Sequence, residues 1–442
     1  MKVLGNVSRA LQELKNDNNN AVAYVYENPE STNKSDKLAN AVFTIKDVFA
    51  TNDAPTQASS KILEGFNPHY NATVVQKLID AGAIKVAKVH NDELALGGTG
   101  TFSAFGLITN PYDSTRLVGG SSSGSVATLT KNVSFALGSD TGDSVRLPAS
   151  YNGVVGFKPS YGAISRYGMF AYASSLDTVS FFSHNVDDLN NILSCVYGVD
   201  TKDMTSVMVP MSDNISPIKP LKVPWLDELD KVEKFVANEY TKLIDKLNSL
   251  DIQVTKIDVN ETLLRAIKPV YDIVSYSEAS SNLSNLNGIA FGQRKDGETW
   301  SEIMTNTRSA GFGKMVQKRL VLGNYYLYSE NQAEIFIKAQ KVRRVIRDYL
   351  NNLHQNYDVV IFPASADVAP KIDVSLNKSH DYMDFILTGS NLGGNPSITI
   401  PWIQTSDNLF VNLALDAQIY HDEKLIGIAK YFENILGGVD EK

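Results

Sequence analysis

Cysteine, histidine and positive charge are all scarce in this sequence of 442 residues. The single cysteine, Cys195, excludes an intrachain disulfide and fits a reducing compartment. Acidic residues outnumber lysine and arginine by 49 to 41, so a broad basic surface for nucleic acid is not expected. The histidines neither pair at helical spacing nor join the cysteine, and we therefore expect no metal site. They are His69, His90, His184, His354, His380 and His421.

Long apolar segments and a phosphate-binding motif are also missing. No run approaches the ~20 apolar residues of a membrane span, and no charged-then-apolar leader opens the sequence. We therefore expect a soluble, cytoplasmic protein without membrane contact, the alternative location being an organelle matrix such as the mitochondrial one. Because the sequence has no GxxxxGKS/T motif, the chain is not expected to hydrolyse ATP itself.

One stretch, residues 119–150, is unusually rich in serine and glycine. It reads GGSSSGSVATLTKNVSFALGSDTGDSVRLPAS. Glycines beside a serine let backbone N–H groups approach a reacting atom, as an oxyanion hole requires. A serine nucleophile also needs a base, and this stretch contains no histidine. The base is therefore expected elsewhere in the chain.

Lys46, in the segment AVFTIKDVFAT, is the candidate base. The residues before it, Ala41–Ile45, are apolar or favour β-structure and predict a buried strand. A lysine at the end of such a strand loses hydration, which lowers its pKa from about 10.4. A neutral lysine can accept a proton and replace histidine in a serine hydrolase. A lone lysine is more often a surface residue, so the hypothesis depends on its combination with the serine-rich stretch.

Three motifs in a fixed order resemble those of the amidase signature family, a family of Ser–Ser–Lys amide hydrolases. They are GGSSSGS (Gly119–Ser125), GSDTGDSVRLPA (Gly138–Ala149) and GVVGFKPSYG (Gly153–Gly162). Three shorter motifs resemble those of the glutamine-using subunits of tRNA-dependent amidotransferases within that family. They are NDELALG (Asn91–Gly97), SRYG (Ser165–Gly168) and SSLD (Ser174–Asp177). The resemblance runs from about Ala41 to about Leu415.

The resemblance implies a role for each catalytic position. Lys46 matches the family's catalytic lysine, Ser121 its bridging serine and Ser144 its acyl-forming nucleophile. Ser121 is preferred over Ser122 because it is the first serine after the Gly-Gly pair. The family's bridging serine follows a non-proline cis peptide bond, which is expected here between Gly120 and Ser121. The oxyanion hole is expected at the backbone of Thr141, Gly142 and Asp143.

Asp143 departs from the family pattern, which has glycine immediately before the nucleophile. The backbone N–H survives this change, but a positive φ at this position would become costly for a residue other than glycine. Aspartate is among the side chains that tolerate the left-handed region best. We therefore keep Asp143 in the predicted oxyanion hole.

Two further residues match substrate contacts of the glutamine-using subfamily. Glutamine carries an α-carboxylate and an α-ammonium group, and a selective site needs one cation and one anion in fixed places. Arg319, in KMVQKRLVLG, matches the residue that binds the carboxylate. Asp384, in YMDFILTGSNLGGNP, matches the residue that binds the ammonium. Either residue alone is more often a surface charge.

The fold class expected is α/β. The resemblance implies the amidase signature fold, with a large mixed β-sheet, helices on both faces and a helical secondary lobe. We divide the chain into an N-terminal helical segment (1–40), a core with the Ser–Ser–Lys site (41–225), a mainly helical substrate-side lobe (226–355) and a C-terminal return to the sheet (356–442).

The function implied is that of a glutaminase subunit which supplies ammonia for converting Glu-tRNA(Gln) to Gln-tRNA(Gln). No cofactor is expected in this chain. ATP and Mg are expected at a partner subunit, and the partners implied are a small C-type subunit together with a B-type tRNA-binding and kinase subunit. Glu-tRNA(Gln) is expected to bind mainly through these partners. The alternatives are a stand-alone amidase for small amides and an inactive scaffold.

Overall fold

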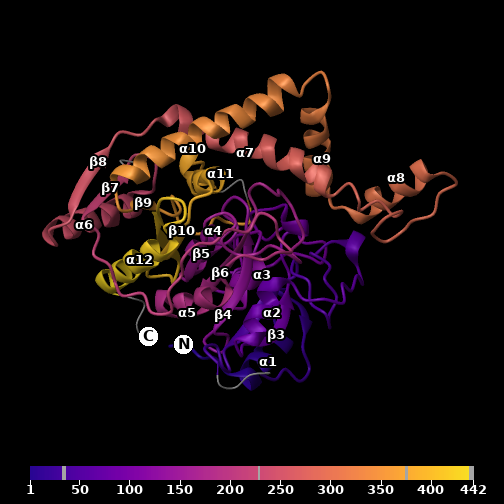
Figure 1. Cartoon of the computed structure of the whole chain (residues 1–442), viewed down its shortest axis with the longest axis horizontal. Coiled ribbons are helices and arrows are strands. Elements are labelled where there is room, and N and C mark those ends of the chain that lie inside the picture. Colours follow the sequence, from indigo (N-terminus) through magenta and orange to yellow (C-terminus); the bar gives the residue numbers. More distant parts are fainter. Residues whose placement is uncertain (32–35, 227–228, 374–376, 438–442) are drawn as a thin grey trace.

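In the part of the chain that the structure describes, a mixed β-sheet of 11 strands organises the molecule, with the order β1-β3-β2-β4-β6-β5-β10-β11-β9-β7-β8 (Figure 1). The computed structural model describes residues 1–31, 36–226, 229–373 and 377–437. The strands are β1 (Val22–Val25), β2 (Val42–Lys46), β3 (Ile84–Val89), β4 (Phe135–Asp140), β5 (Val155–Lys158), β6 (Thr178–Ser183), β7 (Lys222–Leu226), β8 (Gln253–Ile257), β9 (Val360–Pro363), β10 (Ser397–Gln404) and β11 (Phe410–Asp416).

The strands that carry the candidate site lie inside the sheet. β2 runs parallel to both β3 and β4, and β4 runs antiparallel to β6. All residues of β2 and of β4 are buried. Strands covered on both faces require nearly continuous apolar sequence, which VFTIK and FALGSD supply up to their last residues. The polar ends of these two strands therefore enter the protein interior.

Helices pack against this sheet. The α-helices before residue 250 are α1 (Val7–Lys15), α2 (Thr73–Asp80), α3 (Ser123–Ala127), α4 (Arg146–Asn152), α5 (Val186–Val196) and α6 (Lys234–Ser249). The later ones are α7 (Glu261–Asn282), α8 (Trp300–Gly311), α9 (Lys314–Leu327), α10 (Lys338–Asn356), α11 (Gly389–Gly393) and α12 (Asp422–Leu436). The predicted fold class is confirmed, and no helix in the described ranges is long and apolar enough to cross a membrane.

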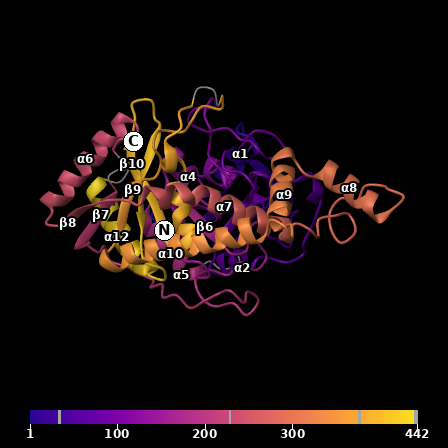
Figure 2. The ribbon, with the colours of Figure 1, turned by 90° about the horizontal axis from the view of Figure 1, so that it is seen from above.

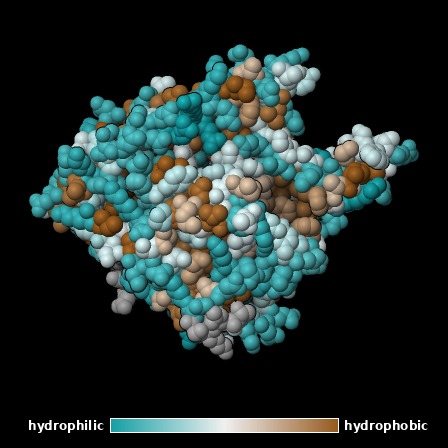
Figure 3. All heavy atoms as spheres, in the orientation of Figure 1, coloured by the Kyte–Doolittle hydropathy of each residue, from teal (hydrophilic) through white to brown (hydrophobic). Residues whose placement is uncertain are grey.

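The helices α7, α9 and α10 form the secondary lobe, in which α7 packs against both of the others. α8 extends away from the body in both views of the ribbon (Figures 1 and 2). On the surface, hydrophobic residues gather where this projection joins the body (Figure 3). The predicted lobe, residues 226–355, also contains the edge strand β8, and the predicted N-terminal helical segment contains β1 beside α1. The division of the chain into four segments stays a prediction.

Candidate active site

Lys46 is the last residue of β2, and its side chain is fully buried. Its Nζ donates to the Oγ atoms of three serines, at 2.8 Å to Ser121, 2.9 Å to Ser122 and 2.9 Å to Ser139. Burial disfavours the charged ammonium and lowers the pKa of Lys46 to about 7, although nearby carboxylates oppose this shift. A lysine with this pKa is partly neutral near neutral pH, as a general base must be.

Ser121 follows a cis peptide bond from Gly120, as predicted. Gly120 is required by crowding, because a Cβ atom there would lie 2.1 Å from Oδ2 of Asp92. The buried Asp92 carboxylate accepts the N–H groups of Thr99, Gly100 and Phe102. The loop before Ser121 is thus packed against a fixed carboxylate, and this packing directs the Ser121 hydroxyl to Lys46.

Ser122 makes additional bonds that give its hydroxyl a structural place. Its Oγ donates to the carbonyl of Ser139 at 3.0 Å and lies 3.3 Å from the Ser139 N–H. These contacts tie the serine-rich turn to the end of β4. In the described ranges, the Ser121 hydroxyl has one hydrogen bond, the one from Lys46. Its oxygen can therefore accept a second hydrogen bond from another hydroxyl.

Ser144 lies in the loop between β4 and α4 and is almost completely buried. Its carbonyl accepts the N–H of Ser122 at 3.2 Å, which joins the two serine segments. Within the part of the chain that the structure describes, its Oγ has no hydrogen bond. The structure thus brings Lys46 and Ser121 into direct contact, and it places Ser144 beside them through the backbone without a Ser121–Ser144 hydroxyl contact.

The predicted oxyanion segment, Thr141 to Asp143, offers unused backbone donors. Within the described residues, none of its three N–H groups donates a backbone hydrogen bond. The Thr141 hydroxyl donates to Asp177 at 2.7 Å and anchors one end of the segment. Asp143 is not among the residues with positive φ, so replacing glycine here introduces no backbone strain. The segment can donate to an oxygen that becomes negative.

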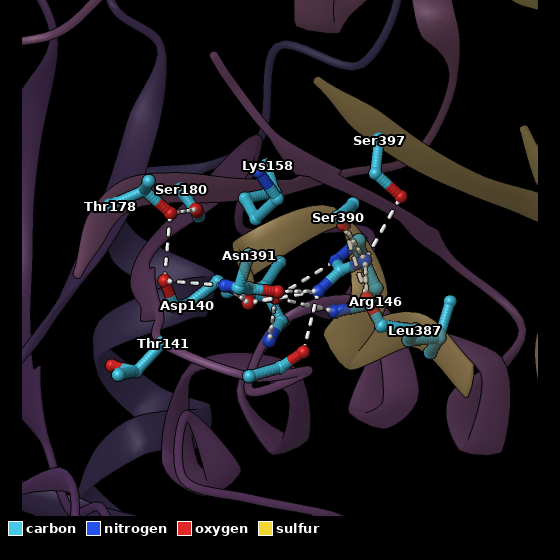
Figure 4. Close-up of polar contacts among 12 residues, drawn as sticks. Asp140, Thr141, Arg146, Lys158, Thr178, Ser180, Leu387, Ser390, Asn391 and Ser397 are labelled. Atoms are coloured by element: carbon cyan, nitrogen blue, oxygen red, sulfur yellow. Dashed lines mark hydrogen bonds and ion pairs between the residues drawn. The ribbon is translucent and has the colours of Figure 1, made fainter. Parts of the chain in front are cut away.

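Arg146 holds the other end of this loop, and it was not predicted as a site residue although it stands in GSDTGDSVR. Its side chain is fully buried and forms a salt bridge with Asp140 at 3.1 Å (Figure 4). It also donates to the Gly142 carbonyl at 2.8 Å and to Oδ1 of Asn391 at 2.6 Å. Its remaining bonds reach the Leu387 carbonyl, Ser390 Oγ and Ser397 Oγ. The sequence signal that could have identified Arg146 is its charge inside the motif GSDTGDSVRLPA.

Arg319 lies in α9 and is surrounded by tyrosines. Its Nη1 donates to the hydroxyl of Tyr172 at 2.9 Å, and its guanidinium lies 5.7 Å from the Tyr172 ring and 5.1 Å from the Tyr276 ring. Its Nε is buried and has no hydrogen-bond partner among the described residues. One further donor of this cation is therefore available to a ligand.

Asp384 lies in the helical turn η5 (Asp381–Thr388) and lines a cavity of about 500 Å³. It accepts the backbone N–H of His380 at 3.0 Å. Asp143 and Tyr151 line the same cavity, whereas Ser144 and Arg319 are not in its described lining. Of the two predicted substrate contacts, Asp384 thus lines this cavity and Arg319 does not. The loop that contains Asp143 contributes to the cavity lining and also carries the nucleophile Ser144. The described residues contain no cluster of metal-ligating side chains, and the absence of a metal site stays a prediction.

Comparisons with known proteins agree with this geometry and with the resemblance noted in the sequence. The family model Amidase matches residues 6–426. The A-type subunit of glutamyl-tRNA(Gln) amidotransferase from Mycoplasma genitalium is 37% identical over 421 residues, which cover 91% of this chain and 88% of the relative. The protein of the same name from Sulfolobus acidocaldarius is 38% identical over 416 residues, covering 91% and 87%.

A solved structure gives the same result. The crystal structure of the A-type subunit of glutamyl-tRNA(Gln) amidotransferase from Thermotoga maritima has a TM-score of 0.80 and 32% identity, covering 97% of this chain and 91% of that one. A crystal structure of an amidase has a TM-score of 0.80 and 25% identity, covering 98% and 96%. The family match spans nearly the whole chain, and the chain belongs to the amidase family.

Proposed function

We propose that this protein hydrolyses glutamine and supplies ammonia as the A-type subunit of a tRNA-dependent amidotransferase. The observation that carries the proposal is the buried Lys46, with a pKa lowered to about 7 and a 2.8 Å hydrogen bond to Ser121. A lysine of this kind, two serines and free backbone donors are the parts that amide hydrolysis by an acyl-enzyme route requires.

The reaction proceeds in two stages. In the first, neutral Lys46 takes the proton of Ser121 while Ser121 takes that of Ser144, and the Ser144 Oγ attacks the side-chain amide carbon of glutamine. The oxygen that becomes negative is held by the N–H groups of Thr141, Gly142 and Asp143. The proton returns through Ser121 to the leaving nitrogen, and ammonia departs. In the second stage, water attacks the glutamyl ester by the same proton route and releases glutamate.

Glutamine is the proposed substrate because two opposite charges, Arg319 and Asp384, flank the loop that carries Ser144. Among the described residues, the buried Nε of Arg319 has no partner and is available to the α-carboxylate, and Asp384 presents a carboxylate in the cavity for the α-ammonium. Together these contacts would favour a free amino acid over a simple amide, because the buried Nε of Arg319 is costly to leave without an anionic partner.

Partner subunits complete the proposed reaction. The similar proteins are named subunits of an amidotransferase that acts on glutamyl-tRNA(Gln). We infer that a B-type subunit binds Glu-tRNA(Gln) and uses ATP and Mg to activate it, and that a small C-type subunit joins the assembly. This chain then provides the ammonia and binds no cofactor itself.

Ammonia release from glutamine tests the proposal. We expect weak release by the isolated chain and at least about a tenfold gain with partner subunits and tRNA, equivalent to about 1.4 kcal/mol of barrier. Full turnover by the isolated chain, unchanged by partners and tRNA, would favour a stand-alone amidase. No release under any of these conditions would indicate a scaffold.

A further inference from the structure

Asp143 lies in the loop that joins β4 to α4 and carries Ser144, here called the nucleophile loop (Thr141–Val145), and its side chain has no role in the proposed reaction. It stands immediately before Ser144, where the resembled family has glycine. Its carboxylate lines the cavity of about 500 Å³ that also contains Asp384. Within the described residues, this carboxylate has no hydrogen bond and no salt bridge. A side chain added next to a nucleophile thus faces open space without a partner.

The surroundings of this carboxylate favour a cationic ligand. Burial raises the pKa of Asp143 to about 7, and repulsion from Asp140 acts in the same direction. The positive charges of Arg146, Lys268 and Arg319 oppose this shift. A carboxylate held in this way gains more from an arriving cation than an exposed one, because the cation restores favourable interactions lost on burial.

Tyr151 links Asp143 to Asp384. It lines the same cavity, and its pKa is raised by burial first and then by the charges of Asp143, Asp384 and Asp367. Three carboxylates that line this cavity therefore act on one phenol: Asp143 from the loop before Ser144, Asp384 from η5 and Asp367 from the segment after β9. A cation that binds in this cavity meets these three carboxylates, of which only Asp384 was expected from the sequence to bind it. The lining cations Arg116, Lys371 and Lys378 are paired with other carboxylates, those of Asp113 and Glu233.

We propose that Asp143 is a specificity-determining residue that contacts the α-ammonium of glutamine together with Asp384. The inference rests on the proposed function, since it concerns the substrate of that same site. A contact made by the residue next to the nucleophile would fix the ammonium relative to the reacting carbon. It adds a charge-assisted hydrogen bond for an amino acid and none for an amide that lacks an amino group.

The test compares two substrates with the full chain, assembled with partner subunits when these are needed for activity. The substrates are glutamine and glutaramate, which keeps the carboxylate and the amide but has no ammonium. Asp143→Asn keeps the shape of the side chain and removes its charge, and Asp143→Gly restores the residue usual in the family. Asp367→Asn is the matched control, because it removes another carboxylate from the lining of the same cavity.

We expect Asp143→Asn and Asp143→Gly to raise KM for glutamine about tenfold, as loss of about 1.4 kcal/mol of binding predicts. KM for glutaramate should change less than twofold in both variants, and Asp367→Asn should change neither value by more than twofold. Equal losses for both substrates would show that Asp143 only positions the nucleophile loop and would overturn the inference. An unchanged KM for glutamine would overturn the inference as well. So would a lowered KM, which would show that the Asp143 carboxylate competes with the substrate carboxylate for Arg319. The proposed function fails separately, if the unaltered protein releases no ammonia from glutamine.

Discussion

Replacing Lys46 by methionine should make the protein more stable at pH 7 while removing its activity. Methionine has a similar length and no charge. Burial lowers the pKa of Lys46 from 10.5 to about 7, a difference of about 3.5 units. At about 1.4 kcal/mol per unit, the charged lysine destabilises the folded state by at most about 5 kcal/mol. Loss of the three serine contacts costs about 1 kcal/mol each, which leaves a net gain of about 1 to 2 kcal/mol.

The pH dependence of this difference gives a sharper test than its size. Lys46 has a lower pKa in the folded protein than in the unfolded chain, so the unfolded chain binds more protons between pH 7 and pH 10.5. The stability of the unaltered protein therefore rises across this window, by about 1.4 kcal/mol per pH unit, relative to Lys46→Met. By pH 9 the two proteins should be equally stable, or their order should be reversed.

Urea unfolding of both proteins at pH 7, 8 and 9, followed by far-ultraviolet circular dichroism, measures this difference. Ammonia release from glutamine by Lys46→Met should fall below about one hundredth of the unaltered rate, because the general base is lost. A stability difference that does not change with pH would refute the reasoning. So would a Lys46→Met protein several kcal/mol less stable than the unaltered one at pH 7, since Lys46 would then be favourably charged in its site.

Five other substitutions test the remaining assignments. Ser144→Ala should release ammonia at less than about one hundredth of the normal rate with an unchanged unfolding midpoint, since only the nucleophilic hydroxyl is lost. Ser121→Ala should be similarly inactive and Ser122→Ala should keep most activity; the reverse order would exchange their roles. Arg319→Ala should raise KM for glutamine much more than KM for a simple amide, and equal rises would make the arginine structural. Arg146→Met should destabilise the fold by about 3 to 5 kcal/mol in urea unfolding, because it leaves a buried carboxylate unpaired; a change below about 1 kcal/mol would contradict this.

Local patterns in the sequence predicted the parts of the site that depend on neighbouring residues. The apolar run Ala41–Ile45 predicted the strand that ends at Lys46, because a strand buried on both faces needs continuous apolar residues. The cis bond before Ser121 was predicted from the resemblance and is present. The direct contact between Lys46 and Ser121 follows from both expectations, and the structure adds its distance and the competing contact to Ser122.

Contacts between distant segments could not be predicted in the same way. β1 is short and only partly buried, so its pattern is too weak to distinguish it from a loop. Four partners of Arg146, among them Leu387 and Asn391, lie more than 240 residues away along the chain, and nothing in local periodicity indicates which residues these are. The different surroundings of Arg319 and Asp384 also depend on how the lobe packs on the sheet.

The buried bonds of Arg146 have a consequence for the order in which the active site is completed during synthesis. Lys46, Ser121 and Ser144 all lie in the first third of the chain. Arg146 has two near partners there, Asp140 and Gly142, but its other side-chain bonds go to Leu387, Ser390, Asn391 and Ser397. On the ribosome, a nascent chain that already contains every proposed catalytic residue therefore still lacks the groups that fix the nucleophile loop. The proposed hydrolytic site becomes complete only when the last tenth of the polypeptide is being added, so an incomplete nascent chain cannot yet hydrolyse glutamine.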